Sequence, residues 1–213
     1  MIIGLGTDCG IRYNLNKYFE YNNATHFFDY VNTNFKTILH ILSDKFDYNT
    51  ELTKEKFNYT NATNSDFNRK CHVIVAKNFY FKSVHDALTT LNANESIDLV
   101  VDKYRRRYIR LIETIKSDND IIFISAIDSF DSRNIVNKNI KEDDFILFFN
   151  YLNHHNPNNN FKLIIITDHD IAISDPILNN KLFIFKSCQD NWQRNKFDWI
   201  KLKNFIILQN NNN

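Results

Sequence analysis

Short runs of consecutive apolar residues recur along the chain and constrain its fold more than any other feature. They occupy residues 1–5, 72–76, 120–127, 162–167, 181–185 and 204–208. Because neither face of such a run is polar, we expect strands buried on both faces, as in a parallel sheet. Segments with helical spacing lie between the runs, at 10–20, 34–46, 95–117 and 141–154. This alternation predicts an α/β fold, a three-layer sandwich with a mostly parallel central sheet of about five or six strands.

The domain organisation predicted from the sequence is simple. No linker rich in Pro, Gly or Ser divides the 213 residues, so we expect a single α/β domain over residues 1–213. The segment 47–70 is polar and weakly patterned, which predicts a surface insertion or long loop. The asparagine-rich end, 209–213, is expected to be a mobile tail.

Charge and cysteine content restrict the partners and the compartment. A formal net charge of +1 creates no overall field that would draw the chain onto nucleic acid or an anionic membrane, so neither partner is expected. The three cysteines, Cys9, Cys71 and Cys188, form no CxxC pair, which favours a reducing, cytoplasmic environment over a disulfide framework. No run has the length of a membrane span or the features of a signal peptide. The oligomeric state stays open.

All three glycines of the chain lie within its first ten residues. Gly4, Gly6 and Gly10 surround Asp8 and Cys9 in the sequence GLGTDCG, between the first apolar run and the first helical segment. We therefore expect Cys9 at or just before a helix N-terminus. The unpaired N–H groups and the helix dipole there stabilise an anion, either a bound phosphate or the cysteine thiolate.

Three interpretations of this turn remain open. The glycine spacing resembles that of a dinucleotide-binding turn, for which Asp29 lies at the distance of the ribose-binding acid. A purely structural turn would leave Cys9 an inert, buried residue. In the third interpretation Cys9 is a nucleophile at a strand-to-helix turn, and this requires a base.

Two histidines are candidates for that base. His85 follows a strand-like segment and is itself followed by Asp86. His169 stands between Asp168 and Asp170 directly after the run 162–167, at the sheet edge where open α/β proteins gather their sites. The sequence does not choose between them. With no HExxH pattern and no paired cysteines, no metal and no cofactor is expected.

The helical segment 95–117 carries a dense group of arginines. Arg105, Arg106, Arg107 and Arg110 lie beside a stripe of apolar residues and tyrosines. A solvated helix face is one interpretation of this group. The other is that one arginine points along the sheet edge towards an anionic site.

Four separated segments share their order and spacing with a known family. They are GLGTDCGIRYNL, FFDYV, VHDAL and KYRRRYIRLIETIKSDNDIIFI. Together they resemble a family of microbial and viral proteins described as papain-like cysteine peptidases, over roughly residues 1–130. Family members show a G-x-x-C turn, then P-F-D-W, H-D-F and Y-x-R-R motifs. The matching residues here are Cys9, Phe28, Asp29, His85, Asp86, Tyr104, Arg106, Arg107 and Arg110. Phe27, Tyr30 and Ala87 replace the family's Pro, Trp and Phe.

The resemblance implies a cysteine-dependent hydrolase acting on an amide or thioester of a peptide or small-molecule substrate. Cys9 would attack the carbonyl, His85 would take its proton, and Asp29 or Asp86 would orient the imidazole. The expected substrate-binding residues are Gly6, Asp8, Gly10, Arg106 and Arg107. The alternative is a non-catalytic phosphate- or nucleotide-binding or protein-interaction module of viral or accessory type.

Overall fold

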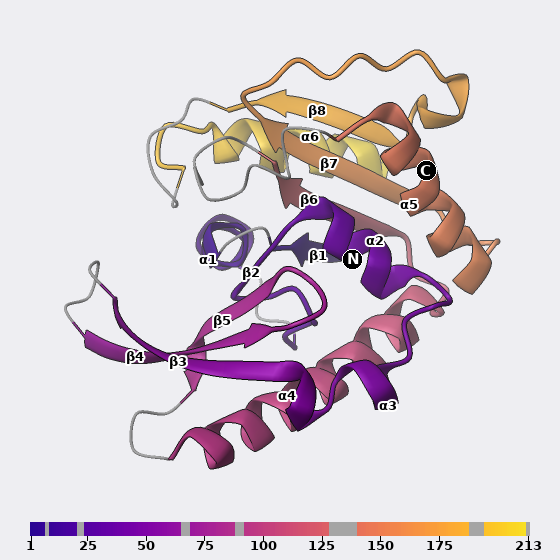
Figure 1. Ribbon diagram of the computed structural model, residues 1–213. Helices are drawn as coiled ribbons and strands as arrows, with labels where there is room; N and C mark the ends of the chain where they lie inside the picture. The colour runs from indigo at the N-terminus through magenta and orange to yellow at the C-terminus, as the bar shows by residue number, and fades with distance from the viewer. Residues whose placement is uncertain are drawn as a thin grey trace.

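The strands of the protein form two sheets, seen in the computed structural model (Figure 1). The structure describes residues 1–6, 9–20, 24–64, 69–87, 92–127, 140–187 and 194–211. The first sheet is parallel and contains, in spatial order, β1 (Ile2–Leu5), β6 (Ile121–Ala126), β7 (Phe161–Thr167) and β8 (Leu182–Lys186). The second is antiparallel, in the order β2 (Val31–Thr33), β5 (Phe81–Ala87), β4 (Arg69–Ala76) and β3 (Phe57–Asn64).

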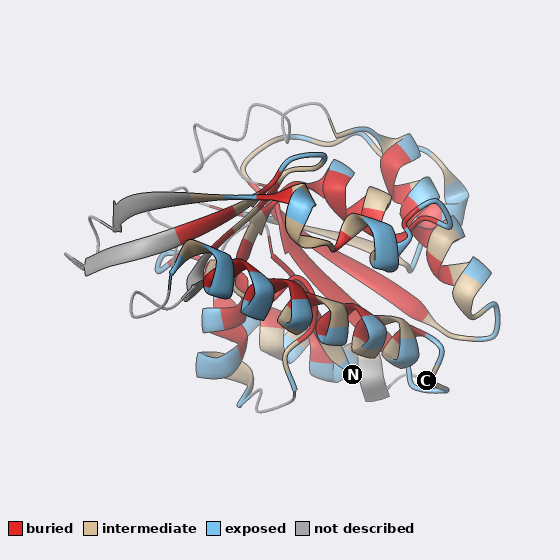
Figure 2. Ribbon diagram, turned by 60° about the horizontal axis from the view of Figure 1, so that its bottom comes forward, coloured by how far each residue is buried: buried red, intermediate tan, exposed pale blue. Residues whose placement is uncertain are grey.

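Helices cover both faces of the parallel sheet (Figures 1 and 2). Their bounds are α1 (Cys9–Phe19), α2 (Phe35–Leu42), α3 (Tyr48–Glu51), α4 (Ala93–Ile115), α5 (Glu142–His155) and α6 (Trp199–Asn211), with short 3-10 turns at Lys54–Lys56 and Pro176–Leu178. On one face, Ile122, Ile124 and Ile164 pack against α1 and α6. On the other, Phe123 and Leu163 belong to a larger core with α2, α4 and α5. The alternate residues of each strand therefore enter different cores, which explains the continuous apolar runs.

The parallel sheet has four strands within the described residues, not the five or six expected, and two of the predicted strands are elsewhere. The run 72–76 is a strand, but it forms part of β4 in the antiparallel sheet. The run 204–208 lies inside helix α6, so its prediction as a strand is wrong. Trp199, Leu202 and Ile206 are the buried residues of this helix. Their three- and four-residue spacing is helical, and a short apolar run alone does not distinguish a strand from a helix.

The segment 47–70 contains regular structure where we predicted an insertion or long loop. It includes α3, a 3-10 turn and strand β3, and the side chains of Leu52 and Phe57 are buried in the main core. β3 is an edge strand paired with β4 from Phe57 to Asn64. Polar residues are common in such edge strands, and they weaken the alternation that would reveal a strand.

The C-terminal end of the described chain is more regular than the mobile tail that we expected. α6 continues to Asn211, so part of the predicted tail 209–213 is helical. Across the described ranges, no helix combines the length and apolar character needed to cross a membrane.

Candidate functional site

The candidate nucleophile lies at the junction of the first strand and the first helix. β1 ends at Leu5 and α1 begins at Cys9, whose thiol is partly exposed. Parallel strands end at a common edge, so Cys9 lies at the carboxyl edge of the parallel sheet, where open α/β folds bind ligands. Gly6 and Gly10, two predicted substrate-binding residues, flank this junction and are buried. Asp8, the third, lies outside the described residues.

Gly4 allows α1 to approach β1 closely. A Cβ atom at Gly4 would lie 3.1 Å from Ile11 Cγ2, 3.3 Å from Leu15 Cδ1 and 3.5 Å from Asp29 Oδ1. The first two distances are shorter than ordinary van der Waals contacts, so the absence of a side chain here sets the height of α1 above the strand. The position of Cys9 follows from that packing.

One face of α1 is fixed to the turn that precedes β2. Arg12 donates through Nη1 to Asp29 Oδ2 over 3.1 Å, and both side chains are buried, with 6% and 1% of their surfaces exposed. Asn16, one turn further along, donates to the Tyr30 hydroxyl over 3.1 Å. Cys9, Arg12 and Asn16 are spaced by three and four residues, so they share this face of the helix. The face that begins with Cys9 is therefore the face that meets Asp29 and Tyr30.

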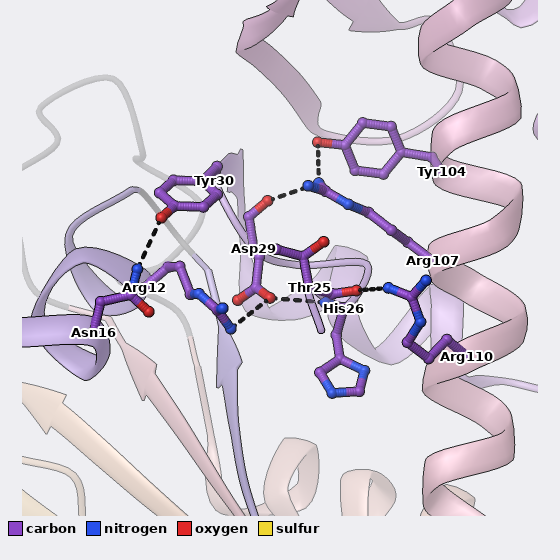
Figure 3. Close-up of polar contacts among 9 residues, drawn as sticks. All are labelled: Arg12, Asn16, Thr25, His26, Asp29, Tyr30, Tyr104, Arg107 and Arg110. Carbon is purple, nitrogen blue, oxygen red and sulfur yellow. Dashed lines mark hydrogen bonds and ion pairs between the residues drawn. The ribbon is translucent and has the colours of Figure 1, made fainter. Parts of the chain in front are cut away.

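Helix α4 holds the same turn from the other side, as Figure 3 shows. Arg107 Nη1 donates to the Asp29 carbonyl over 3.1 Å and to the Tyr104 hydroxyl over 3.0 Å, and its guanidinium lies over the Tyr104 ring. Arg110 donates to the Thr25 carbonyl. Arg107 is buried, so the interpretation of the arginines as one solvated face is wrong for this residue. Arg106, by contrast, is exposed.

Asp29 sits at the centre of these contacts. Its Oδ2 accepts from Arg12 and from the backbone N–H of His26, over 2.7 Å. Oδ1 is buried and accepts no hydrogen bond within the described residues. Burial raises the pKa of the Asp29 carboxyl, and this effect outweighs the opposing effects of Arg12, the His26 N–H and Arg107. A carboxylate with one occupied and one unoccupied oxygen can both anchor a turn and accept a further donor.

His26 is a site residue that the sequence analysis missed. Only 4% of its surface is exposed, and its Nδ1 has no hydrogen-bond partner within the described residues. Desolvation lowers the pKa of His26 to about 4, with further lowering by Arg110, Arg12 and Arg107. The imidazole is therefore uncharged at neutral pH. Nothing around THFFD marks this histidine, because its environment comes from helices distant in sequence.

The predicted base His85 and its neighbour Asp86 lie on β5, and their side chains are outside the described part of the structure. The backbone pairing is informative. Ser83 pairs with both Val31 and Ile74, and Ala87 pairs with His72. Between these pairs β4 has one residue and β5 has three, so β5 bulges at 84–86. Bulges redirect side chains and are common beside active sites.

The second predicted base, His169, follows β7 at the same sheet edge as Cys9. Its Nε2 lies 3.3 Å from Asp168 Oδ1, and its backbone N–H donates to Thr167 Oγ1 over 3.1 Å. Asp170 is bound by Lys186. β6 lies between β1 and β7, so the two strand ends are about 10 Å apart. Within the described ranges, no group of three or more His, Cys, Asp or Glu side chains is arranged to hold a metal ion.

The chain matches the model of a known protein family. The family model described as "Putative papain-like cysteine peptidase (DUF1796)" matches residues 1–171, a span that contains Cys9, Asp29, His85 and the arginines of α4. No curated protein and no solved structure matches the chain.

Proposed function

Because the chain belongs to this papain-like cysteine peptidase family, we propose that it is a cysteine-dependent hydrolase with Cys9 as nucleophile and His85 as base. The substrate is an amide or thioester of a peptide or small molecule. The proposal includes a reducing compartment such as the cytoplasm, because the reaction requires Cys9 as a thiol.

The observation that carries the proposal is that the face of α1 containing Cys9 lies against the turn before β2. Arg12 and Asn16 bind the turn at Asp29 and Tyr30, and Cys9 shares their helix face. β5 runs antiparallel to β2 from the Val31–Ser83 pair, so its chain continues from Ser83 in the direction of that turn. The bulge at 84–86 supports a base there because bulges are common beside active sites, and His85 is one of its residues.

The helix dipole alone is too weak to activate the thiol. Its typical worth of about 0.3–1 kcal/mol is below the roughly 1.4 kcal/mol that shifts a pKa by one unit. An imidazole partner is therefore required. In the proposed reaction His85 takes the proton of the Cys9 thiol, and the thiolate adds to the carbonyl carbon.

The remaining steps return the enzyme to its first state. The C–N or C–S bond of the substrate breaks, the leaving amine or thiol takes the proton from His85, and a thioester on Cys9 remains. Water then gives a proton to His85 and hydroxide to the thioester carbonyl. The C–S bond breaks, the acid is released, and the Cys9 thiolate takes the proton back from His85. Asp29, through Oδ1, and Asp86 are the two carboxyls proposed to orient the imidazole.

Site-resolved alkylation tests this assignment. Near neutral pH, iodoacetamide should label Cys9 much faster than Cys71 and Cys188, and His85→Ala should abolish the difference. His154→Ala is the matched control, since His154 is exposed and lies 3.4 Å from Asp44 on another part of the molecule. His169→Ala tests the second base. Equal, slow labelling of all three cysteines contradicts the proposal, and loss of reactivity only in His169→Ala assigns the base to His169 instead.

A further inference from the structure

His26 and three arginines form a basic cluster beside the turn before β2. The cluster consists of His26, Arg12 from α1, and Arg107 and Arg110 from α4, with Asp29 as the carboxylate among them. Asp29 accepts from Arg12 through its side chain and from Arg107 through its carbonyl. All three guanidinium groups lie near enough to the His26 ring to lower its pKa. Positive charge gathered beside a buried ring favours the binding of an anion there.

Arg110 retains donors that the described residues do not use. Its Nη1 donates to the Thr25 carbonyl, and no other partner of its guanidinium lies among the described residues. The side chain is half-buried, so it also reaches the protein surface. A guanidinium has five N–H donors in a planar fork, which matches the paired oxygens of a carboxylate or phosphate.

His26 is the second, independent observation. Its side chain is almost fully buried, yet Nδ1 has no partner within the described residues. In Figure 3 the His26 ring extends from the turn on the side where the Arg110 guanidinium lies, whereas Arg12 approaches Asp29 from the opposite side. A buried polar atom without a partner costs about 1–3 kcal/mol, which a ligand atom at this place would recover.

We propose that the basic cluster binds an oxyanion, a carboxylate or phosphate group, between the His26 ring and the Arg110 guanidinium. The cluster shares Asp29 with the chemistry proposed for Cys9, but binding of the anion does not require the thiol. Protonation of His26 and binding of the anion support each other, because a negative charge beside the ring offsets the repulsion from Arg12, Arg107 and Arg110. The anion therefore binds more tightly as the pH falls towards the pKa of His26.

The test is an NMR titration of His26 in the full chain with Cys9→Ser, so that its outcome is independent of any hydrolase activity. Inorganic phosphate and acetate are added separately, each against chloride at equal ionic strength. We expect one of them to raise the pKa of His26 by at least about one unit, which corresponds to tenfold tighter binding to the protonated form. A response to phosphate assigns the site to a phosphate group, and a response to acetate alone assigns it to a carboxylate.

Arg110→Gln should abolish this response. The matched control is Arg105→Gln, which removes an arginine of the same helix that donates to a backbone carbonyl, that of Leu52, away from His26. The proposal is overturned if neither anion moves the His26 titration more than chloride does, or if Arg110→Gln responds like the parent. Should Arg110→Gln not fold, the titration of the parent chain decides the question alone.

Discussion

Arg12 and Asp29 form an ion pair that is buried on both sides, with 3.1 Å between Nη1 and Oδ2. The pair joins the helix that begins with Cys9 to the turn held by α4. It is therefore one of the contacts through which the position of the thiol depends on the rest of the fold, beside the packing at Gly4.

Arg12→Met should destabilise the protein by about 3–5 kcal/mol, because it leaves Asp29 buried without its guanidinium. Urea denaturation measures the loss. The exposed pair Lys54–Asp98 is the control, and Lys54→Met should cost no more than about 1 kcal/mol.

The cost of Arg12→Met should also depend on pH. Burial already raises the pKa of Asp29, and removal of Arg12 raises it further. A group whose pKa is raised in the folded state stabilises the protein below its unfolded pKa, and this contribution is lost as the pH rises through the folded value. The loss should therefore be smaller near pH 4 than near pH 7. An equal loss at both values would show that removal of Arg12 leaves the pKa of Asp29 unchanged.

His26 should make the protein less stable in acid. Its pKa is lowered from 6.5 to about 4, so its contribution is complete above pH 6.5 and is lost as the pH falls towards 4. The full difference corresponds to about 3 kcal/mol. Comparison of urea unfolding for the parent and His26→Asn in chloride buffer isolates this effect, since other histidines contribute equally to both. Parallel stability curves for the two proteins would contradict the assignment.

Gly4→Ala should push α1 away from β1. The new methyl group would meet Ile11 Cγ2 and Leu15 Cδ1 at 3.1 and 3.3 Å, and overpacking of this kind costs about 1–3 kcal/mol. We expect a lower melting temperature together with a changed alkylation rate at Cys9. A variant with an unchanged melting temperature and unchanged Cys9 reactivity would mean that the Ile11 and Leu15 side chains adjust and that α1 stays in place.

Asn92→Ala should weaken α4 without disturbing the site. Asn92 and Glu95 form a reciprocal cap at the N-terminus of this helix, and loss of such a cap typically costs about 1 kcal/mol. Arg107 and Arg110 lie about four and five turns away along the helix, so the anion response of His26 should persist. If the response disappears with the cap, the basic cluster depends on the whole helix rather than on its own contacts.

The sequence predicted the parallel strands well and the second sheet poorly, for a physical reason. β6 and β7 are buried on both faces, so their runs are apolar throughout and easily recognised. β3 is a polar edge strand without a clear alternation of apolar and polar residues. Its extended conformation is stabilised by pairing with β4. The apolar run 204–208 was misleading because the exposed Ile207 and Leu208 follow the buried Ile206 directly and make the segment look like a strand. The buried residues of α6 as a whole have helical spacing.

The site was predictable only in part. The family motifs pointed to Cys9, Asp29 and Arg107, and the structure connects Asp29 with Arg107 and with the helix of Cys9. The Arg12–Asp29 pair and the environment of His26 arise from contacts between distant segments, which leave no local pattern. His85 and Asp86 stay predictions, since the structure describes their backbone alone.

The pairing of β1 has a consequence for the order of events during synthesis. β1, the strand before Cys9, pairs with Ile122–Ser125 of β6. In the sequence, all four strands of the antiparallel sheet and α4 lie between these two strands. Contacts between such remote segments form late, after the intervening elements have folded. A ribosome must therefore deliver the chain at least as far as Ser125 before β1 is paired and the Cys9 thiol takes its place at the sheet edge.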